Sequence, residues 1–405
     1  MKARYSDAAQ ARETSLCCPI DYDKKYLEVL PSEIIERDYG CGDPSKYLNP
    51  GETVLDLGSG GGKICYIASQ VVGPTGKVIG VDMNDDMLAL ARKYKDEVGQ
   101  RIGWHNVDFR KGRIQDMKLD LELLDQHLQA HPVQGVNAFM ELEEHAKQLR
   151  QTRPLVPTES VDVVVSNCVL NLVDTDQKKQ LFQEIYRVLR NGGRAVISDI
   201  VCDEEVPLAL QQDADLWSGC ASGAMTEDGF LQAFVDAGFY GVRLLKRDSE
   251  PWQTLQGIEL RSYTVEAFKG KFGPCLERNQ AVIYTGPFFA VEDDDNHRLV
   301  RGKRYAVCEK TFNLYHRQPY AQFFQFVEPL NPVPREAAQP FPCGTTRLRH
   351  PRETKGFEYN ATSTGATGCC TGEKPCCGGE KVCSEEAKTS CCGGEKACCG
   401  EKSSS

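Results

Sequence analysis

A glycine-rich turn between an apolar run and a helical stretch most constrains how this chain can fold. The apolar run at 53–58 breaks into GSGGGK and continues as ICYIASQVV, which is the order strand, tight turn and helix. Further Val- and Ile-rich runs at 77–83, 161–167 and 195–200 are separated by helical stretches. Buried strands that alternate with helices predict a parallel α/β sheet with helices on both faces.

The residues around this turn predict a nucleotide-type ligand. Gly58 and Gly60 have no Cβ, so the backbone can approach a ligand closely. Asp82 ends the next strand, where a carboxylate can accept hydrogen bonds from ribose hydroxyls. Asp56 before the first glycine suits a cationic or amino-acid-bearing ligand, and Lys63 stands where a dinucleotide fingerprint has Gly or Ala. A turn that serves only strand–helix packing is the alternative.

The acidic composition excludes several classes of function. The 405 residues carry 48 Lys and Arg against 58 Asp and Glu, a net charge of −10. This balance argues against a general nucleic-acid or membrane-surface binder. No apolar run approaches the roughly 20 residues of a membrane span, and the N-terminus lacks the apolar region of a signal peptide. We therefore expect a cytoplasmic protein whose thiols stay reduced.

The 19 cysteines are distributed unevenly. Nine lie in 369–405, where short CC repeats alternate with Gly, Glu and Lys. Such a segment has too few apolar residues to bury a core, so we expect disorder unless an ion organises it. Three roles fit the tail: binding a thiophilic ion and passing it to the folded part, sequestration, or a dispensable extension. We favour accessory ion binding.

Four thiol-bearing turns are expected around one crevice. Cys168 follows a predicted strand directly, where the ligand crevice of an open α/β sheet lies. Cys220 stands in a segment of small residues that suits a loop over this crevice, Cys41 in a Gly-flanked turn, and Cys17 and Cys18 near the N-terminus. Each alone is typical of an inert buried cysteine. Together they predict a site for a soft ion.

Several short sequence motifs resemble those of known enzymes. DLGSGGG, VIGVDM and VVSNCVLNLV resemble the class I S-adenosylmethionine-dependent methyltransferases, and SLCCP, RDYGCGDP and WSGCASGA extend the resemblance to arsenite methyltransferases over about 15–327. The resemblance implies a Rossmann-like sheet with a helical and loop arsenic-binding extension, a smaller C-terminal α+β domain and a disordered Cys-rich tail. It implies transfer of the methyl group of S-adenosylmethionine to thiolate-bound As(III), in arsenic detoxification.

The resemblance also assigns roles to individual residues. It makes Cys41, Cys168 and Cys220 the arsenic ligands and Cys18 the redox partner of Cys41, with Cys17 as the alternative to Cys18. It implies a cofactor site formed by Tyr39, Asp56, Gly58, Gly60, Asp82, Met83, Arg113, Ile114 and Asn167.

The chemistry of arsenic agrees with these ligands. Thiolates are the soft ligands that As(III) prefers, and they leave a lone pair on arsenic that can attack a sulfonium methyl group without a general base. Each transfer oxidises arsenic, so a cytosolic thiol reductant of the thioredoxin or glutathione type must reset a thiol pair. We expect arsenite and methylated arsenicals as substrates, no nucleic-acid or membrane partner, and a monomer.

Two other functions fit part of the pattern. One is a methyltransferase for an organic acceptor, with structural thiols, and the other is a metal-sequestering protein whose methyltransferase domain has lost activity. The isolated cysteines are interpreted as core packing: Cys65, Cys202, Cys275, Cys308 and Cys343.

The patterns divide the chain into six segments. These are an N-terminal segment (1–44), a methyltransferase domain (45–200) with a helical insertion (115–158), an arsenic-binding region (201–270), a C-terminal domain (271–330), a linker (331–368) and the tail (369–405).

Overall fold

The structure is a computed structural model that describes most of the chain. The described residues are 2–10, 20, 22–37, 39–213, 216–217, 219–344 and 346–363. Cys17, Cys18 and the tail at 369–405 lie outside the described residues, so the predictions for them stay predictions.

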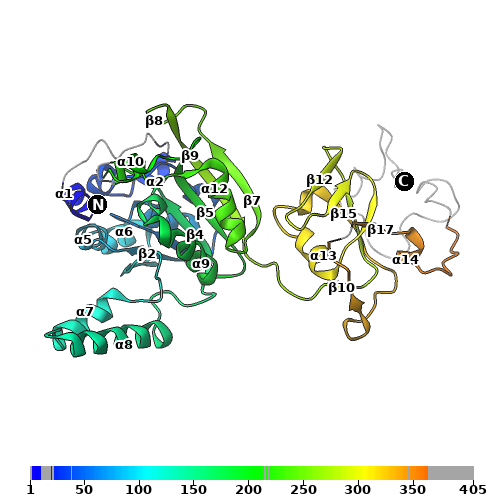
Figure 1. The fold of residues 1–405 in the computed structure, drawn as a ribbon, viewed down its shortest axis with the longest axis horizontal. Coiled ribbons are helices and arrows are strands. Elements are labelled where there is room, and N and C mark those ends of the chain that lie inside the picture. The colour runs from blue at the N-terminus through cyan, green and yellow to red at the C-terminus, as the bar shows by residue number, and fades with distance from the viewer. Residues whose placement is uncertain are drawn as a thin grey trace, which may run out of the picture.

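A mixed sheet of nine strands forms the centre of the larger domain (Figure 1). Its strand order is β3-β2-β1-β4-β5-β9-β7, with β6 beside β5 and β8 beside β9. Strands β1 to β6 pair in parallel, whereas β7, β8 and β9 pair antiparallel. The strands are β1 (Thr53–Leu57), β2 (Lys77–Asp82), β3 (Val107–Lys111), β4 (Val161–Asn167), β5 (Leu189–Cys202), β6 (Met225–Thr226), β7 (Tyr240–Arg247), β8 (Gln253–Leu255) and β9 (Ile258–Phe268).

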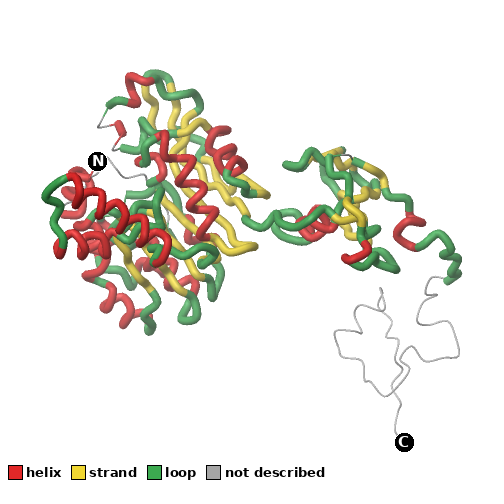
Figure 2. Tube along the Cα trace, turned by 60° about the horizontal axis from the view of Figure 1, so that its bottom comes forward, coloured by secondary structure: helices red, strands yellow, loops and turns green. Residues whose placement is uncertain are grey.

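Helices cover both faces of this sheet, as Figure 2 shows. Alternate residues of β1 enter different cores: Val54 packs with α4, α5 and α6, and Leu55 packs with α9 and α12. Burial on both faces explains why the parallel strands are nearly continuous runs of Val, Ile and Leu. The helices of this domain are α1 (Lys2–Gln10), α2 (Lys24–Leu27), α3 (Ser32–Glu36), α4 (Lys63–Val72), α5 (Asp85–Lys93), α6 (Lys95–Ile102), α7 (Leu121–Ala130), α8 (Val136–Thr152), α9 (Lys178–Val188), α10 (Leu208–Gln211) and α12 (Glu227–Asp236).

The predicted α/β sheet with helices on both faces is confirmed (Figure 2). At one edge its parallel strands are joined by the antiparallel strands β7 and β9, which come from 201–270, the region that the sequence predicts as arsenic-binding. The predicted insertion at 115–158 contains α7 and α8, which extend away from the sheet in Figure 1. Among the described residues, none of the helices is both long and apolar enough to span a membrane.

A smaller C-terminal domain follows β9. It contains a four-stranded sheet in the order β15-β11-β14-β17 and two two-stranded sheets, and α13 packs Leu314 against Tyr240 and Phe268 of the larger domain. Its elements are β10 (Leu276–Glu277), β11 (Ala281–Tyr284), β12 (Ala290–Glu292), β13 (Arg298–Val300), β14 (Arg304–Ala306), α13 (Glu309–Tyr315), β15 (Phe324–Val327), β16 (Gln339–Pro340), β17 (Arg347–Leu348) and α14 (Pro351–Lys355).

The structure differs from the linker expected at 331–368. Strand β16 pairs with β10, and β17 pairs with β14, so this segment closes the C-terminal domain as far as α14. Clustered Pro, Thr, Ser and Gly were interpreted as a linker. These residues instead surround two strands of only two residues each, which are too short to produce a periodic pattern.

The buried face of α12 allows a test of the packing. Phe234 is fully buried, with its ring centroid 4.9 Å from that of Phe182, while the neighbouring Val235 is 39% exposed. Phe234→Ala should lower the free energy of unfolding by about 3–5 kcal/mol, because a large cavity would open in the core. Chemical denaturation measures this change. Val235→Ala is the matched control and should have little effect; equal losses in both variants would contradict the assigned orientation of α12.

Candidate active site

A cavity of about 440 Å³ lies at the carboxyl ends of the parallel strands. Residues at or just after the ends of β1, β2, β3 and β4 line it, together with residues from the segment before β1. The lining includes all nine residues that the sequence predicts for the cofactor site. This is the crevice at which open α/β sheets bind ligands. The structure therefore brings the predicted cofactor residues together in one place.

The glycine-rich loop after β1 is fixed by Asp82 at the end of β2. The two carboxylate oxygens of Asp82 accept hydrogen bonds from the backbone N–H groups of Gly60 and Asn84, each at 2.8 Å. Burial raises the pKa of Asp82. Gly58 has a left-handed backbone (φ +67°), and a Cβ there would lie 2.3 Å from Val169 Cγ1, so no larger residue fits.

The cavity wall also contains a polar group that has no partner. The buried hydroxyl of Ser59 makes no hydrogen bond in the part of the chain that the structure describes. Asp56 is nearly fully buried, and its carboxylate accepts a hydrogen bond from the Cys65 thiol at 3.2 Å. Buried polar groups are normally satisfied, so an unpaired hydroxyl in a cavity wall points to a polar ligand.

Three of the predicted thiols meet beside this cavity. Cys41, Cys168 and Cys220 are all buried and belong to one cluster, and the Cys220 thiol donates to the Cys168 carbonyl at 3.1 Å. The ligand atoms of Cys41, Cys168 and Asp199 lie within 4.8 Å of one another. Cys168 also lines the cavity. The thiol cluster and the cavity therefore share one wall.

The backbone at two of these thiols is unusual. Cys168 and Cys220 have left-handed φ angles of 63° and 65°, which non-glycine residues rarely adopt. Surrounding hydrogen bonds hold them there: Cys168 N–H donates to the Ser198 carbonyl at 2.8 Å, and the Asn171 amide donates to the Cys220 carbonyl at 3.3 Å. Backbone strain that neighbours hold in this way is concentrated at functional sites.

One amide side chain joins the turn that carries Cys41 to the end of β4. The Oδ1 atom of Asn167 accepts hydrogen bonds from the backbone N–H groups of Cys41 at 2.9 Å and Gly42 at 3.0 Å, and its Nδ2 donates to the Tyr22 hydroxyl at 3.2 Å. Ser262 of β9 donates to the Cys41 carbonyl at 2.6 Å. These contacts set the distance between Cys41 and Cys168.

Contacts between thiols, together with burial, favour the protonated forms of Cys168 and Cys220. A hydrogen bond from Cys220 lowers the pKa of Cys168, but the contact with Cys41 and burial outweigh it, so this pKa lies well above its usual value. The contact with Cys168 and burial likewise raise the pKa of Cys220. A soft ion that binds here must therefore displace thiol protons.

Two residues of this site are not among those predicted from the sequence. Asp199 is fully buried, accepts hydrogen bonds from the N–H groups of Leu170 and Ile200 at 2.8 Å each, and has its pKa raised by burial to about 6. Its position at the end of the apolar run AVISDI was the signal that could have revealed it. Tyr5 of α1 lines the cavity and hydrogen-bonds with Cys220. No motif marks this residue.

Two glycines allow a test of the Asn167 contacts. A Cβ on Gly40 would lie 2.1 Å from Asn167 Nδ2, whereas a Cβ on Gly135 would meet nothing within 4 Å, and neither glycine has a left-handed backbone. Gly40→Ala should displace Asn167 and cost about 1–3 kcal/mol of unfolding free energy, because two buried N–H groups lose their acceptor. Alkylation of Cys41 should also become faster.

Gly135→Ala is the matched control for this variant. It should leave both the unfolding free energy and the alkylation rate of Cys41 unchanged. If Gly40→Ala behaved in the same way, the contacts of Asn167 would not position the Cys41 turn.

Both domains match known protein families, and most of the chain is similar to known proteins. A methyltransferase domain family matches residues 48–238, and a domain family of unknown function matches residues 271–359. An arsenite methyltransferase from Aquipseudomonas alcaligenes is 32% identical over 376 residues, covering 88% of this chain and 94% of that protein. The arsenite methyltransferase of Mus musculus is 29% identical, with 86% and 87% covered. The crystal structure of an arsenic(III) S-adenosylmethionine methyltransferase from Chlamydomonas reinhardtii is 25% identical, with a TM-score of 0.51 and coverage of 80% of this chain and 99% of that one.

Proposed function

The chain belongs to the arsenite methyltransferase family, and on this premise we propose that it transfers the methyl group of S-adenosylmethionine to trivalent arsenic held by thiolates. The observation that carries the proposal is the position of Cys168, which lines the cavity and also belongs to the buried thiol cluster. An ion bound by these thiols would lie against the cavity that holds the methyl donor. This arrangement favours arsenic methylation over an organic acceptor or simple sequestration.

The cavity has features that suit S-adenosylmethionine. The unpaired Ser59 hydroxyl and the Asp82 carboxylate lie in its wall, and the loop glycines leave space for a ligand. When bound, S-adenosylmethionine supplies an electrophilic methyl group on a sulfonium sulfur. We assign its contacts to Tyr39, Asp56, Gly58, Gly60, Asp82, Met83, Arg113, Ile114 and Asn167.

Cys41, Cys168 and Cys220 would bind arsenite as three thiolates. Each As–S bond that forms replaces an As–O bond, and the thiol proton leaves with the hydroxide as water. Because the lone pair on arsenic is the nucleophile, no side chain has to act as a general base. The task of the chain is to position the ion against the cavity, and the fixed turns around Cys168 and Cys220 serve this purpose.

A reductant completes the cycle. Methyl transfer oxidises arsenic from the trivalent to the pentavalent state, and two thiols that become a disulfide return the two electrons. We assign these thiols to Cys41 and Cys18, with Cys17 as the alternative to Cys18; both alternatives lie outside the described residues. A thiol reductant of the thioredoxin or glutathione type would restore the pair. We further propose a cytoplasmic monomer that accepts arsenite and methylated arsenicals.

Replacement of the shared thiol tests the proposal. The chain, incubated with arsenite, S-adenosylmethionine and a thiol reductant, should produce methylated arsenic that chromatographic speciation detects. Cys168→Ser should reduce turnover by about a hundredfold or more, because a hydroxyl is a hard, poor ligand for a soft ion. Binding of S-adenosylmethionine by this variant should be retained. Absence of methylated arsenic from the unmodified chain, or full turnover by Cys168→Ser, would reject the proposal.

Two aspartates near β2 allow a test of the methyl-donor site. Asp82→Ala should weaken binding of S-adenosylmethionine by about tenfold or more, since a charged acceptor in the cavity wall is lost. Asp86 lies in the first turn of α5 and does not line the cavity, so Asp86→Ala is the control and should bind the donor normally. Titration calorimetry with S-adenosylmethionine measures both. Equal affinities for the two variants would exclude Asp82 from the donor site.

A further inference from the structure

Three cysteines of the C-terminal domain converge outside the cavity lining. Cys275 directly precedes β10, Cys308 lies between β14 and α13, and Cys343 follows β16. Their sulfur atoms lie within 4.8 Å of one another, and no further His, Cys, Asp or Glu of the described residues joins the group. None of the three lines the cavity. From the sequence, the three cysteines are expected to be separate packing residues, because nothing in their spacing connects them.

This three-thiol cluster is open to solvent on one side. Cys308 is fully buried, Cys275 is half-buried and Cys343 is exposed. The Cys308 sulfur is held by the backbone N–H of Thr311, which donates to it at 3.3 Å. The backbone N–H of Phe341 donates to the Cys275 carbonyl at 2.8 Å. The thiols are therefore anchored from inside the domain and can be reached from outside it.

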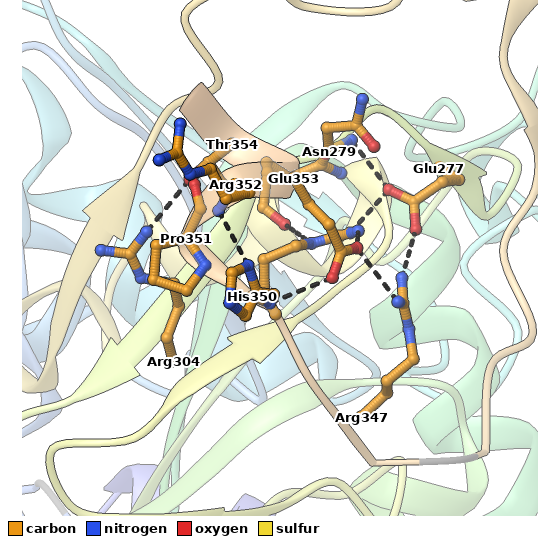
Figure 3. Close-up of polar contacts among 11 residues, drawn as sticks. Glu277, Asn279, Arg304, Arg347, His350, Pro351, Arg352, Glu353 and Thr354 are labelled. Atoms are coloured by element: carbon orange, nitrogen blue, oxygen red, sulfur yellow. Dashed lines mark hydrogen bonds and ion pairs between the residues drawn. The ribbon is translucent and has the colours of Figure 1, made fainter. Parts of the chain in front are cut away.

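An ionic network holds the segments that carry the thiols (Figure 3). The buried guanidinium of Arg349 donates to Glu277 of β10 at 2.6 Å and to Glu353 of α14 at 2.7 Å. Arg347 of β17 contacts both carboxylates at 3.1 Å. These contacts fix the chain shortly after Cys275 and shortly after Cys343, and no disulfide joins the two thiols. Replacement of a thiol by a hydroxyl should therefore leave the domain folded.

The groups around Cys275 lower the pKa of its thiol. Burial raises the pKa of Cys275, but hydrogen bonds from Cys343 and Cys308 and the charge of Lys310 outweigh burial, so this pKa lies below its usual value. A thiol that ionises readily is a good ligand for a soft ion. This environment differs from the cavity site, where burial raises the pKa of Cys168 and Cys220.

We propose that Cys275, Cys308 and Cys343 form a second site for trivalent arsenic, which binds the ion without methylating it. Three thiols, with no fourth ligand among the described residues, suit a soft three-coordinate ion, whereas structural zinc sites close with four protein ligands. The choice of arsenic among thiophilic ions rests on the proposed function. On binding of arsenous acid, three As–S bonds form and three As–O bonds break. Each thiol proton leaves with a hydroxide as water, and arsenic stays trivalent.

Alkylation of individual cysteines tests this site in the full chain. The chain carries Cys168→Ser and Cys220→Ser, so that the proposed methylation site is disabled, and is kept reduced with a phosphine. Iodoacetamide is added with and without arsenite, and mass spectrometry follows the modification of each cysteine. Arsenite should slow the alkylation of Cys275 and Cys343 by about tenfold or more, because only free thiolates react.

Removal of the buried member of the cluster should abolish this protection. In the added variant Cys308→Ser, both Cys275 and Cys343 should react at their arsenite-free rates; Ser is itself a preferred residue at a helix start, so α13 should persist. Cys202→Ser is the matched control, since Cys202 is as deeply buried as Cys308 and belongs to another cluster. This control should keep the protection. As a second variant, Cys343→Ser changes an exposed residue and should also release Cys275.

Three outcomes would overturn the second site: alkylation rates that arsenite does not change, protection by Zn²⁺ but not by arsenite, or protection that persists in both Cys308→Ser and Cys343→Ser. Because the methylation site is disabled throughout, these outcomes do not bear on turnover. Conversely, a chain that produces no methylated arsenic but shows the protection would retain the second site and lose only the proposed function.

Discussion

The side chain of Asn167 connects the two halves of the active site. Its oxygen accepts hydrogen bonds from two successive N–H groups in the Cys41 turn, and its nitrogen reaches the Tyr22 hydroxyl. The same residue ends β4 and lines the cavity. A buried N–H that loses its acceptor costs about 1–3 kcal/mol, so this single amide strongly favours one position of the turn. The position of Cys41 relative to the cavity therefore depends on the Asn167 amide.

The two thiol clusters of this chain differ in their exposure to solvent and in the direction in which the pKa of one thiol, Cys275, is shifted. Around Cys168 and Cys220 the environment is apolar and buried, and the thiols keep their protons until an ion displaces them. Around Cys275, hydrogen-bonding thiols and a neighbouring ammonium group lower the thiol pKa, whereas burial and the contact with Cys275 raise the pKa of Cys343. Cys343 is nevertheless exposed to solvent. A buried site protects a bound ion from water and competing thiols. An open site exchanges its ion more readily, which suits a site that binds arsenic without transforming it.

The sequence revealed features that depend on neighbouring residues along the chain. The order strand, glycine turn and helix predicted the loop that holds Gly58, and local strings around Cys168 and Cys220 predicted thiols beside a crevice. The sequence did not reveal contacts that only tertiary pairing creates. Asp199 faces the thiols because β5 lies beside β4, and the three-thiol cluster exists because β16 pairs with β10. The pairing of β10 with β16 leaves no periodic pattern, since each of these strands contains two residues.

If the cavity thiols bind arsenic as proposed, their wide spacing along the chain would make the substrate a cross-link. Cys168 and Cys220 are separated by 52 positions, and Cys41 comes from a third segment. An ion bonded to all three closes loops in the unfolded chain as a disulfide would, and a loop of this size corresponds to about 4 kcal/mol of stabilisation. Each methyl group added to arsenic takes the place of one thiolate. Successive transfers would therefore open these loops one at a time. Each methylated arsenical would then be joined to the protein by fewer As–S bonds than the one before it.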